Sequence, residues 1–281
     1  MTATAQPDRE LLGCDFSSSP STRKNIVLAS GRLCGQRVQL LNTERFSTLD
    51  SWQQRLSQGP WLGGFDLPFG LPRELVHALD WPTDWLACVQ HFAARSRADL
   101  RQQFKAFCDA RPAGQKFAHR ATDRPAGSSP SMKWVNPPVA WMMHAGVPRL
   151  LAVGAWLPAH QPDPGRTASG AGRVALEAYP GLLARELLGG STSYKSDDKA
   201  RQTPERQQAR RHMLDALAAG HTRLDLQLEL TPAQAEALVA DASGDALDAV
   251  LCLVQVAWAG QRGAYGLPAH VDPLEGWITS A

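Results

Sequence analysis

The N-terminal part of the chain alternates short apolar runs with turn residues, a pattern typical of consecutive β-strands. We expect strands at 11–15, 24–30 and 36–46, because Ser, Pro and Gly residues separate these runs. Links as short as these predict an antiparallel meander. The next segment, 47–59, has a helical pattern that ends at Gly59.

The run WLGGFD, residues 61–66, is apolar up to its last residue, which is typical of a strand buried on both faces. The preceding strand–helix connection predicts that it lies parallel to the first strand. The carboxyl ends of these strands then lie side by side, where open α/β sheets keep their sites. The sequence therefore predicts an α/β fold whose mixed sheet combines an antiparallel three-strand meander with parallel strands and is flanked by helices.

The remainder of the chain is mostly helical in pattern. We expect two further strands, at 150–158 and 173–180, and four helices, at 181–190, 203–220, 231–242 and 244–259. The region 75–148 combines helical segments with a Pro-, Gly- and Ser-rich stretch, and we interpret it as a helical and lid insertion. The whole chain, 1–281, is then a single domain, and its C-terminal tail is irregular or ends as a short edge strand.

Acidic residues stand at the ends of the apolar runs. Asp15 closes the first strand, Asp66 the fourth and Glu177 a later one. Asp245 and Asp248 share one helix face at spacing i, i+3, in a segment that is otherwise almost entirely apolar. Charged residues at the edge of a core are costly unless something pairs with them. We therefore expect these carboxylates to gather around a cation.

Each acid also has a purely structural interpretation. Asp15 and Asp66 can be turn residues, because both precede Pro- or Ser-rich segments. Asp245 can be the N-cap of its helix, where a negative charge is favourable. A shared site accounts for all of these acids together better than separate turns do.

Basic residues supply candidates for contacts with a substrate. Glu177 can bind metal, orient a ligand, or pair with Arg185 or Lys195. Lys195 opens a basic run, which is usually a solvated helix face but can also contact phosphate. We favour a phosphate contact for Lys195, because it follows the helix after Glu177. Arg120 and Lys133, in the basic loop of the insertion, are further candidates for substrate binding.

Composition narrows the classes of function. The formal net charge of +2 demands no polyanionic partner, so nucleic-acid binding would depend on local basic patches. No run of about 18 apolar residues is present, and we expect no membrane partner. The N-terminus lacks the basic start and long apolar stretch of a secretory signal, which predicts a cytoplasmic protein. Oligomerisation is left open.

Six segments resemble, in this order along the chain, those of domain-of-unknown-function family 429 (DUF429): GCDFSSSPSTRKNIVLA, WLGGFDLPFGLP, KWVNPPVAWMMHAGVPRL, LEAYPGLLARELLG, SYKSDD and DALDAVLCLVQVAWAG. The resemblance covers roughly residues 11–278. Members of that family are regarded as predicted RNase-H-like nucleases. The resemblance therefore implies an RNase-H-like fold.

The resemblance also implies roles for the five acids. In the wider superfamily an acid in the first strand is matched by Asp15, and an acid that ends the fourth strand is matched by Asp66. The resolvase branch carries two acids three apart on its last helix, which Asp245 and Asp248 resemble. Glu177 matches a Glu-x-x-Pro segment of the family itself.

These observations predict a metal-dependent nuclease that hydrolyses a phosphodiester bond in nucleic acid with two Mg²⁺ or Mn²⁺ ions. Asp15, Asp66, Asp245 and Asp248 are the expected metal ligands, and Glu177 is a fifth catalytic candidate. One alternative is a phosphotransferase or nucleotide hydrolase of the actin-like branch, whose members usually duplicate the domain and carry Gly-rich phosphate loops. The other is a non-catalytic module that binds nucleic acid or protein.

Overall fold

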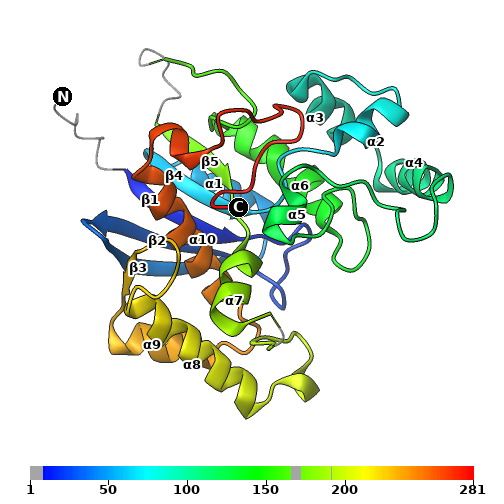
Figure 1. Ribbon diagram of the computed structural model, residues 1–281. Coiled ribbons are helices and arrows are strands. Elements are labelled where there is room, and N and C mark those ends of the chain that lie inside the picture. The colour runs from blue at the N-terminus through cyan, green and yellow to red at the C-terminus, as the bar shows by residue number, and fades with distance from the viewer. Residues whose placement is uncertain (1–8, 166–171, 191) are drawn as a thin grey trace.

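A computed structural model describes residues 9–165, 172–190 and 192–281 as an α/β protein with a six-stranded mixed sheet flanked by helices (Figure 1). The strands are β1 (Glu10–Asp15), β2 (Ile26–Cys34), β3 (Arg37–Phe46), β4 (Trp61–Asp66), β5 (Arg173–Glu177) and β6 (Gln227–Glu229). Their order in the sheet is β5-β4-β1-β2-β3-β6. The predicted antiparallel meander β1–β2–β3 is confirmed, as is the parallel pairing of β4 with β1.

Helices cover both faces of the sheet. They are α1 (Leu49–Leu56), α2 (Arg73–Ala78), α3 (Trp85–Ala93), α4 (Arg97–Asp109), α5 (Asp123–Ala126), α6 (Val139–Ala152), α7 (Pro180–Leu188), α8 (Pro204–Ala218), α9 (Pro232–Ala240) and α10 (Asp245–Gly260). Successive strand residues point to opposite faces, so Leu11 packs with the α7–α10 layer and Leu12 with α1 and the insertion. Figure 1 shows α10 across one face and the insertion helices α2 to α6 at one side.

The sequence-based prediction of a strand at 150–158 is wrong. Residues 150–152 are the last turn of α6, and Gly154, at φ +72°, stands just after the helix end. Only Trp156 pairs with the sheet, through a single parallel bridge to Val174. A short apolar run does not distinguish a strand from the end of a buried helix, which explains the error.

Two short pairings were not specified by the apolar pattern. β6 is a three-residue edge strand that pairs parallel with β3, and its sequence QLE has no continuous apolar run. In the C-terminal tail, Ile278 forms one bridge beside Glu177, which agrees with the expected irregular tail or short edge strand. The predicted strand 173–180 ends earlier, at Glu177, because Pro180 opens α7.

The predicted insertion 75–148 contains α3, α4, α5 and most of α2 and α6. Its aromatic side chains, including those of Trp81, Trp85 and Phe104, are buried in the same hydrophobic cluster as Leu12 and Phe65 of the sheet. The insertion therefore shares a core with one face of the sheet. The single-domain organisation stays a prediction.

Two glycines let α10 lie directly against the central strands. A Cβ atom on Gly13 of β1 would lie 2.1 Å from the backbone oxygen of Ala249. A Cβ atom on Gly64 of β4 would lie 2.9 Å from the backbone oxygen of Cys252. Only glycine permits so close a backbone approach. This packing brings the N-terminal turn of α10 to the carboxyl ends of β1 and β4.

No helix in the described part of the chain is long and apolar enough to cross a membrane. The expectation that the N-terminus is not a secretory signal falls largely on residues 1–8, which lie outside the described residues. The cytoplasmic location stays a prediction.

Candidate metal centre and active site

Asp15 and Asp66 end two neighbouring parallel strands and are direct partners in the register of that pair. Asp15 is 8% exposed and Asp66 is half-buried, and both line one cleft of about 360 Å³. Neither carboxylate accepts a hydrogen bond or an ion pair from the residues that the structure describes. The predicted proximity of these two acids is therefore confirmed, and both lack a dedicated partner.

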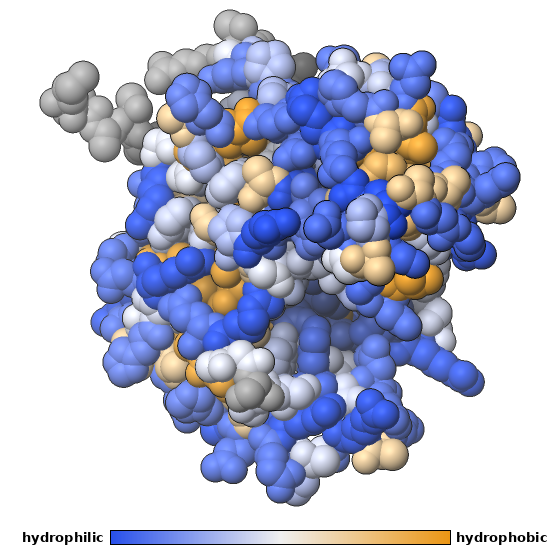
Figure 2. Space-filling view, turned by 45° about the vertical axis from the view of Figure 1, so that its right-hand side comes forward, coloured by the Kyte–Doolittle hydropathy of each residue, from blue (hydrophilic) through white to orange (hydrophobic). Residues whose placement is uncertain are grey.

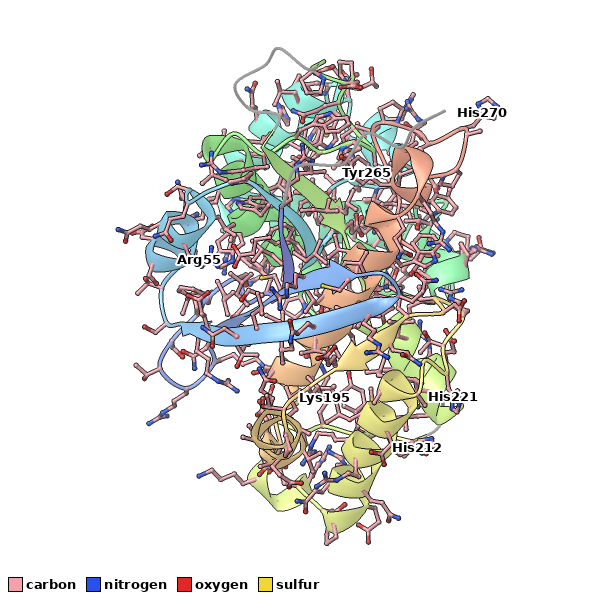
Figure 3. The ribbon with its side chains drawn as sticks, turned by 90° about the vertical axis from the view of Figure 1, so that its left-hand side faces the viewer. Arg55, Lys195, His212, His221, Tyr265 and His270 are labelled. Carbon is pink, nitrogen blue, oxygen red and sulfur yellow. The ribbon has the colours of Figure 1, made fainter. Side chains whose placement is uncertain are left out.

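The N-terminal turn of α10 supplies the other two acids of the cluster. Gly244, at φ +74°, is the N-cap, so the interpretation of Asp245 as the N-cap is wrong. Asp245 instead accepts a hydrogen bond of 2.8 Å from Lys24 Nζ. Asp248 is fully buried and accepts hydrogen bonds from the hydroxyl of Tyr194 and from Lys195 Nζ. Figure 3 shows Lys195 close to this end of α10.

Burial and the negative charges of neighbouring acids raise the pKa values of Asp15 and Asp66. Burial raises the pKa of Asp15 well above its ordinary range, and the charges of Asp248 and Asp245 raise it further. Burial and the charge of Asp248 raise the pKa of Asp66 to about 7. Lys195 acts in the opposite direction on both. A cluster of carboxylates that raise one another's pKa values attracts positive charge.

Charge and donor chemistry of the cluster suit a hard divalent cation. Among the described residues, the cations paired with the four carboxylates are Lys24, which also pairs with Asp197, and Lys195. When all four acids are ionised, at least two negative charges are therefore left without compensation. Carboxylate oxygens are the ligands that Mg²⁺ and Mn²⁺ prefer. Within the described residues, however, no three Asp, Glu, His or Cys side chains are already arranged as a metal-binding group. In this arrangement the ammonium groups of Lys24 and Lys195 bind the carboxylate oxygens of Asp245 and Asp248, where a metal ion would lie.

Glu177 is held by a different set of contacts. Its carboxylate oxygens accept hydrogen bonds of 2.6 and 2.8 Å from Arg120, and one of them also accepts a bond of 3.0 Å from the backbone N–H of Phe69. The suggested pairing of Glu177 with Arg185 or Lys195 is therefore wrong. Burial raises the pKa of Glu177, and the adjacent Arg120 partly offsets this effect.

Arg120 is 2% exposed and joins three parts of the molecule. Besides Glu177 on β5, its guanidinium donates to Asp123 of α5 at 2.9 Å and to the backbone carbonyl of Glu275 in the tail at 3.1 Å. Arg120 and Glu177 line the cleft, but these contacts occupy most of their hydrogen-bonding groups. Lys133 is half-buried and is not among the described residues that line this cleft.

Sequence reasoning missed Lys24 and the hydroxyl of Tyr194. A signal for Lys24 was present: it lies in the short connection between β1 and β2, and the connection of a hairpin lies at the edge where Asp15 ends β1. Tyr194 precedes Lys195, but its contact with Asp248 depends on how the chain after α7 folds back toward α10. No local pattern encodes that return.

A second cavity, of about 270 Å³, adjoins the first and shares Asp66, Tyr179 and Lys195 with it. Arg185 lines this second cavity. Figure 2 shows a hollow lined largely by hydrophilic residues on the side of the molecule where the insertion comes forward. Asp15, Asp66 and Asp248 therefore border a recessed cleft with two adjoining chambers.

Fold and site together define an α/β protein with a cluster of four largely buried carboxylates at the carboxyl ends of β1 and β4 in a mixed sheet. Residues 13–272 match the family model described as "Protein of unknown function (DUF429)", and the chain belongs to this family. Comparisons with curated proteins and with solved structures found no significant match.

Proposed function

We propose that this protein is a metal-dependent nuclease with an RNase-H-like fold that hydrolyses a phosphodiester bond in nucleic acid. The observation that carries the proposal is the convergence of Asp15, Asp66, Asp245 and Asp248 at the carboxyl edge of β1 and β4. These acids are far apart in the sequence, and nothing in the fold requires four carboxylates at one place.

The sheet supports the fold part of the proposal. An antiparallel meander is followed by β4 and β5, which lie parallel beside β1 in the order β5-β4-β1-β2-β3. The acids lie at the ends of β1 and β4 and in the first turn of α10, which supports the roles that the resemblance implies for them.

The charge balance supports the metal part. Mg²⁺ or Mn²⁺, when bound, supplies Lewis-acid activation of water and of the phosphate. Asp15 and Asp66 have no competing hydrogen-bond donors among the described residues, so their oxygens are available as ligands. Lys195 is 41% exposed at its side chain and can withdraw its flexible end from Asp248 when a cation arrives.

Lys195 then has a second role in this proposal. Its side chain lines both chambers of the cleft, next to the acids. An ammonium group released from Asp248 lies within reach of a phosphate held at the acids, where it offsets negative charge that develops during hydrolysis. Glu177 acts as a positioning residue through Arg120, and the contribution of Lys133 stays a prediction.

Calorimetric titration with Mn²⁺ tests the proposal directly. We expect the unmodified protein to bind Mn²⁺ and Asp15→Asn to lose most of that binding. A control variant, Asp50→Asn, changes a carboxylate that is 91% exposed on α1, and we expect it to bind as the unmodified protein does. Equal binding by all three proteins, or by none, would contradict the proposed metal centre.

The same variant separates loss of ligand from loss of fold. Because burial and neighbouring acids raise the pKa of Asp15, its charge is unfavourable in the folded protein, and Asp15→Asn should raise the melting temperature without metal. Mn²⁺ affinity should also fall between pH 8 and pH 6, since Asp66, with a pKa of about 7, takes up a proton that competes with the metal.

Activity is measured with bis(4-nitrophenyl) phosphate and with labelled DNA and RNA in Mg²⁺ or Mn²⁺. We expect Asp66→Asn to abolish hydrolysis of all of these substrates. Activity that survives in Asp66→Asn would point to a contaminant or to a different site.

A further inference from the structure

The acids lie at the floor of a recess and not on an open surface. Asp248 is fully buried, Asp245 is 4% exposed and Asp15 is 8% exposed. Asp15 and Asp66 line the cleft of about 360 Å³, which is at the lower end of the size of small-molecule pockets, about 300–1,000 Å³, so a phosphodiester that reaches these two acids must enter it. The shape of this entrance therefore selects the substrate.

One wall of this chamber is apolar and comes from the insertion. Pro137 and Pro138 are exposed before α6, and Val139 and Met142 of α6 are half-buried beside them. Phe16 and Leu67, which follow Asp15 and Asp66, complete an apolar lining next to the acids. An unpaired base presents flat apolar faces that stack on such surfaces, whereas phosphate and sugar gain little from them.

The adjoining chamber, of about 270 Å³, carries two cationic side chains besides Asp66 and Asp248. Arg185 and Lys195 line it, and it meets the first chamber at Asp66, Tyr179 and Lys195. The guanidinium of Arg185 is oriented by the Tyr179 hydroxyl at 3.1 Å and by the backbone carbonyl of Ala126. These two cationic side chains beside the acids suit the phosphate that follows a bound nucleotide.

We propose that the substrate is single-stranded nucleic acid, with one unpaired base against the apolar wall of the first chamber and the neighbouring phosphate toward Arg185. This inference rests on the proposed nuclease function and names its substrate class. In a duplex each base is stacked and paired, so its entry into the chamber carries the cost of flipping it out of the stack. The bases of a single strand are already unpaired, so this cost does not arise, and the flexible backbone can bend into the recess.

The test compares one labelled oligonucleotide as a single strand and as a blunt duplex. Cleavage is followed in Mn²⁺, and binding is followed by fluorescence anisotropy in Ca²⁺, which takes the same kind of oxygen ligands. We expect the single strand to be cleaved and bound at least about tenfold better than the duplex, given the cost of base flipping. Equal values, or a preference for the duplex, overturn the inference.

Two tryptophan variants test the chamber itself. Met142→Trp fills the apolar wall and should lower cleavage of the single strand by about tenfold, while Met142→Leu should retain it. Val135→Trp is the matched control: Val135 is 48% exposed in the same loop region and is not among the described residues that line either chamber. If Met142→Trp and Val135→Trp behave alike, the chamber does not hold the substrate.

Hydrolysis of bis(4-nitrophenyl) phosphate separates the two proposals. If that small diester is hydrolysed but the single strand is neither bound nor cleaved in preference to the duplex, the present inference fails and the phosphodiesterase proposal stands. If the diester is not hydrolysed and Mn²⁺ is not bound, the proposed function fails. A preference for the single strand in anisotropy would then still support the chamber as a binding site.

Discussion

Buried charged residues of this protein fall into two kinds. Glu177 and Arg120 satisfy each other through two hydrogen bonds, as buried ions usually do. Asp15 and Asp66 have no such partner among the described residues, and their pKa values are raised. Buried acids with raised pKa values are a common feature of functional sites, because a bound ligand supplies the interaction that offsets the cost of burying their charge.

His160 provides a test at the residue scale that is independent of the acids. The ring stacks on Trp85 with centroids 4.6 Å apart, and its Nδ1 lies 2.6 Å from the backbone oxygen of Pro273. Burial, aided by the nearby charge of Arg120, lowers the pKa of His160 to about 3, although the hydrogen bond with Pro273 and the charge of Asp272 act in the opposite direction. The folded protein therefore keeps this ring neutral at pH values at which the unfolded chain protonates it.

We expect His160 to make the protein less stable in mild acid. As the pH falls from 7 to 5, His160 of the unfolded chain, with a pKa near 6.5, binds a proton, whereas His160 of the folded protein stays neutral. This difference lowers the free energy of unfolding by about 2 kcal/mol. The variant His160→Gln keeps a hydrogen-bond donor for the backbone oxygen of Pro273, and its free energy of unfolding should not fall in this way. Urea unfolding of both proteins at pH 7 and pH 5 provides the measurement. Asp66, which acts with the opposite sign, is common to both, so an identical pH dependence would contradict the prediction.

The sequence predicted four of the clustered residues, and the reason is that each ends or begins a regular element. An acid after a buried apolar run must lie at a strand end, which is how Asp15 and Asp66 were placed. Arg120, in contrast, lies in a loop that no periodicity describes, and its burial follows from the tertiary position of β5 and the tail. Loop residues that reach a site by long-range packing are beyond a local pattern.

At the scale of elements, α10 connects the sheet to the site. It is buried over nearly its whole length, and its N-terminal turn carries Asp245 and Asp248. Its distance from the sheet is set by Gly13 and Gly64, where the helix and strand backbones meet. The two glycines in LLGCD and WLGGFD thus precede the acids by two residues and place the helix that completes the cluster.

Gly13→Ala tests this role of α10. The added Cβ atom would lie 2.1 Å from the backbone oxygen of Ala249, so the helix must move away from β1. We expect a loss of more than about 3 kcal/mol in unfolding free energy, together with weaker Mn²⁺ binding. Gly263→Ala is the control, because a Cβ atom there meets nothing within 4 Å, and it should change stability by less than about 0.5 kcal/mol. Similar effects of the two substitutions would count against the argument.

The elements themselves were predictable where the apolar period was long. β1 to β4 and α10 were placed correctly in kind, because each combines a clear run or period with a turn residue at its end. The prediction of a strand at 150–158 was wrong because the apolar run LLAVGAW fits the end of a buried helix as well as it fits a strand. β6 was missed because a three-residue edge strand forms by pairing with the free edge of β3 and leaves no apolar pattern in the sequence.

At the scale of the whole molecule, Arg120 holds the insertion and the C-terminal tail against the sheet. Its partners are Glu177 on β5, Asp123 on α5 and the backbone of Glu275. The apolar wall formed by Pro137, Pro138 and Met142 belongs to the same insertion. This pair of buried charges therefore determines where the wall of the cleft lies relative to the acids.

Arg120→Met tests that role against the earlier prediction that Arg120 contacts the substrate. Removal of the guanidinium leaves the buried carboxylates of Glu177 and Asp123 without their cationic partner, which should lower the unfolding free energy by about 3–5 kcal/mol. Arg211→Met is the control, because Arg211 forms a solvent-exposed pair with Glu236 whose loss should leave the unfolding free energy nearly unchanged. Arg120→Met combined with Glu177→Gln should be less destabilised than the sum of the single variants, since it removes one unpaired charge. If Arg120→Met instead keeps full stability and loses only affinity for nucleic acid, Arg120 is a substrate contact and the positioning role is wrong.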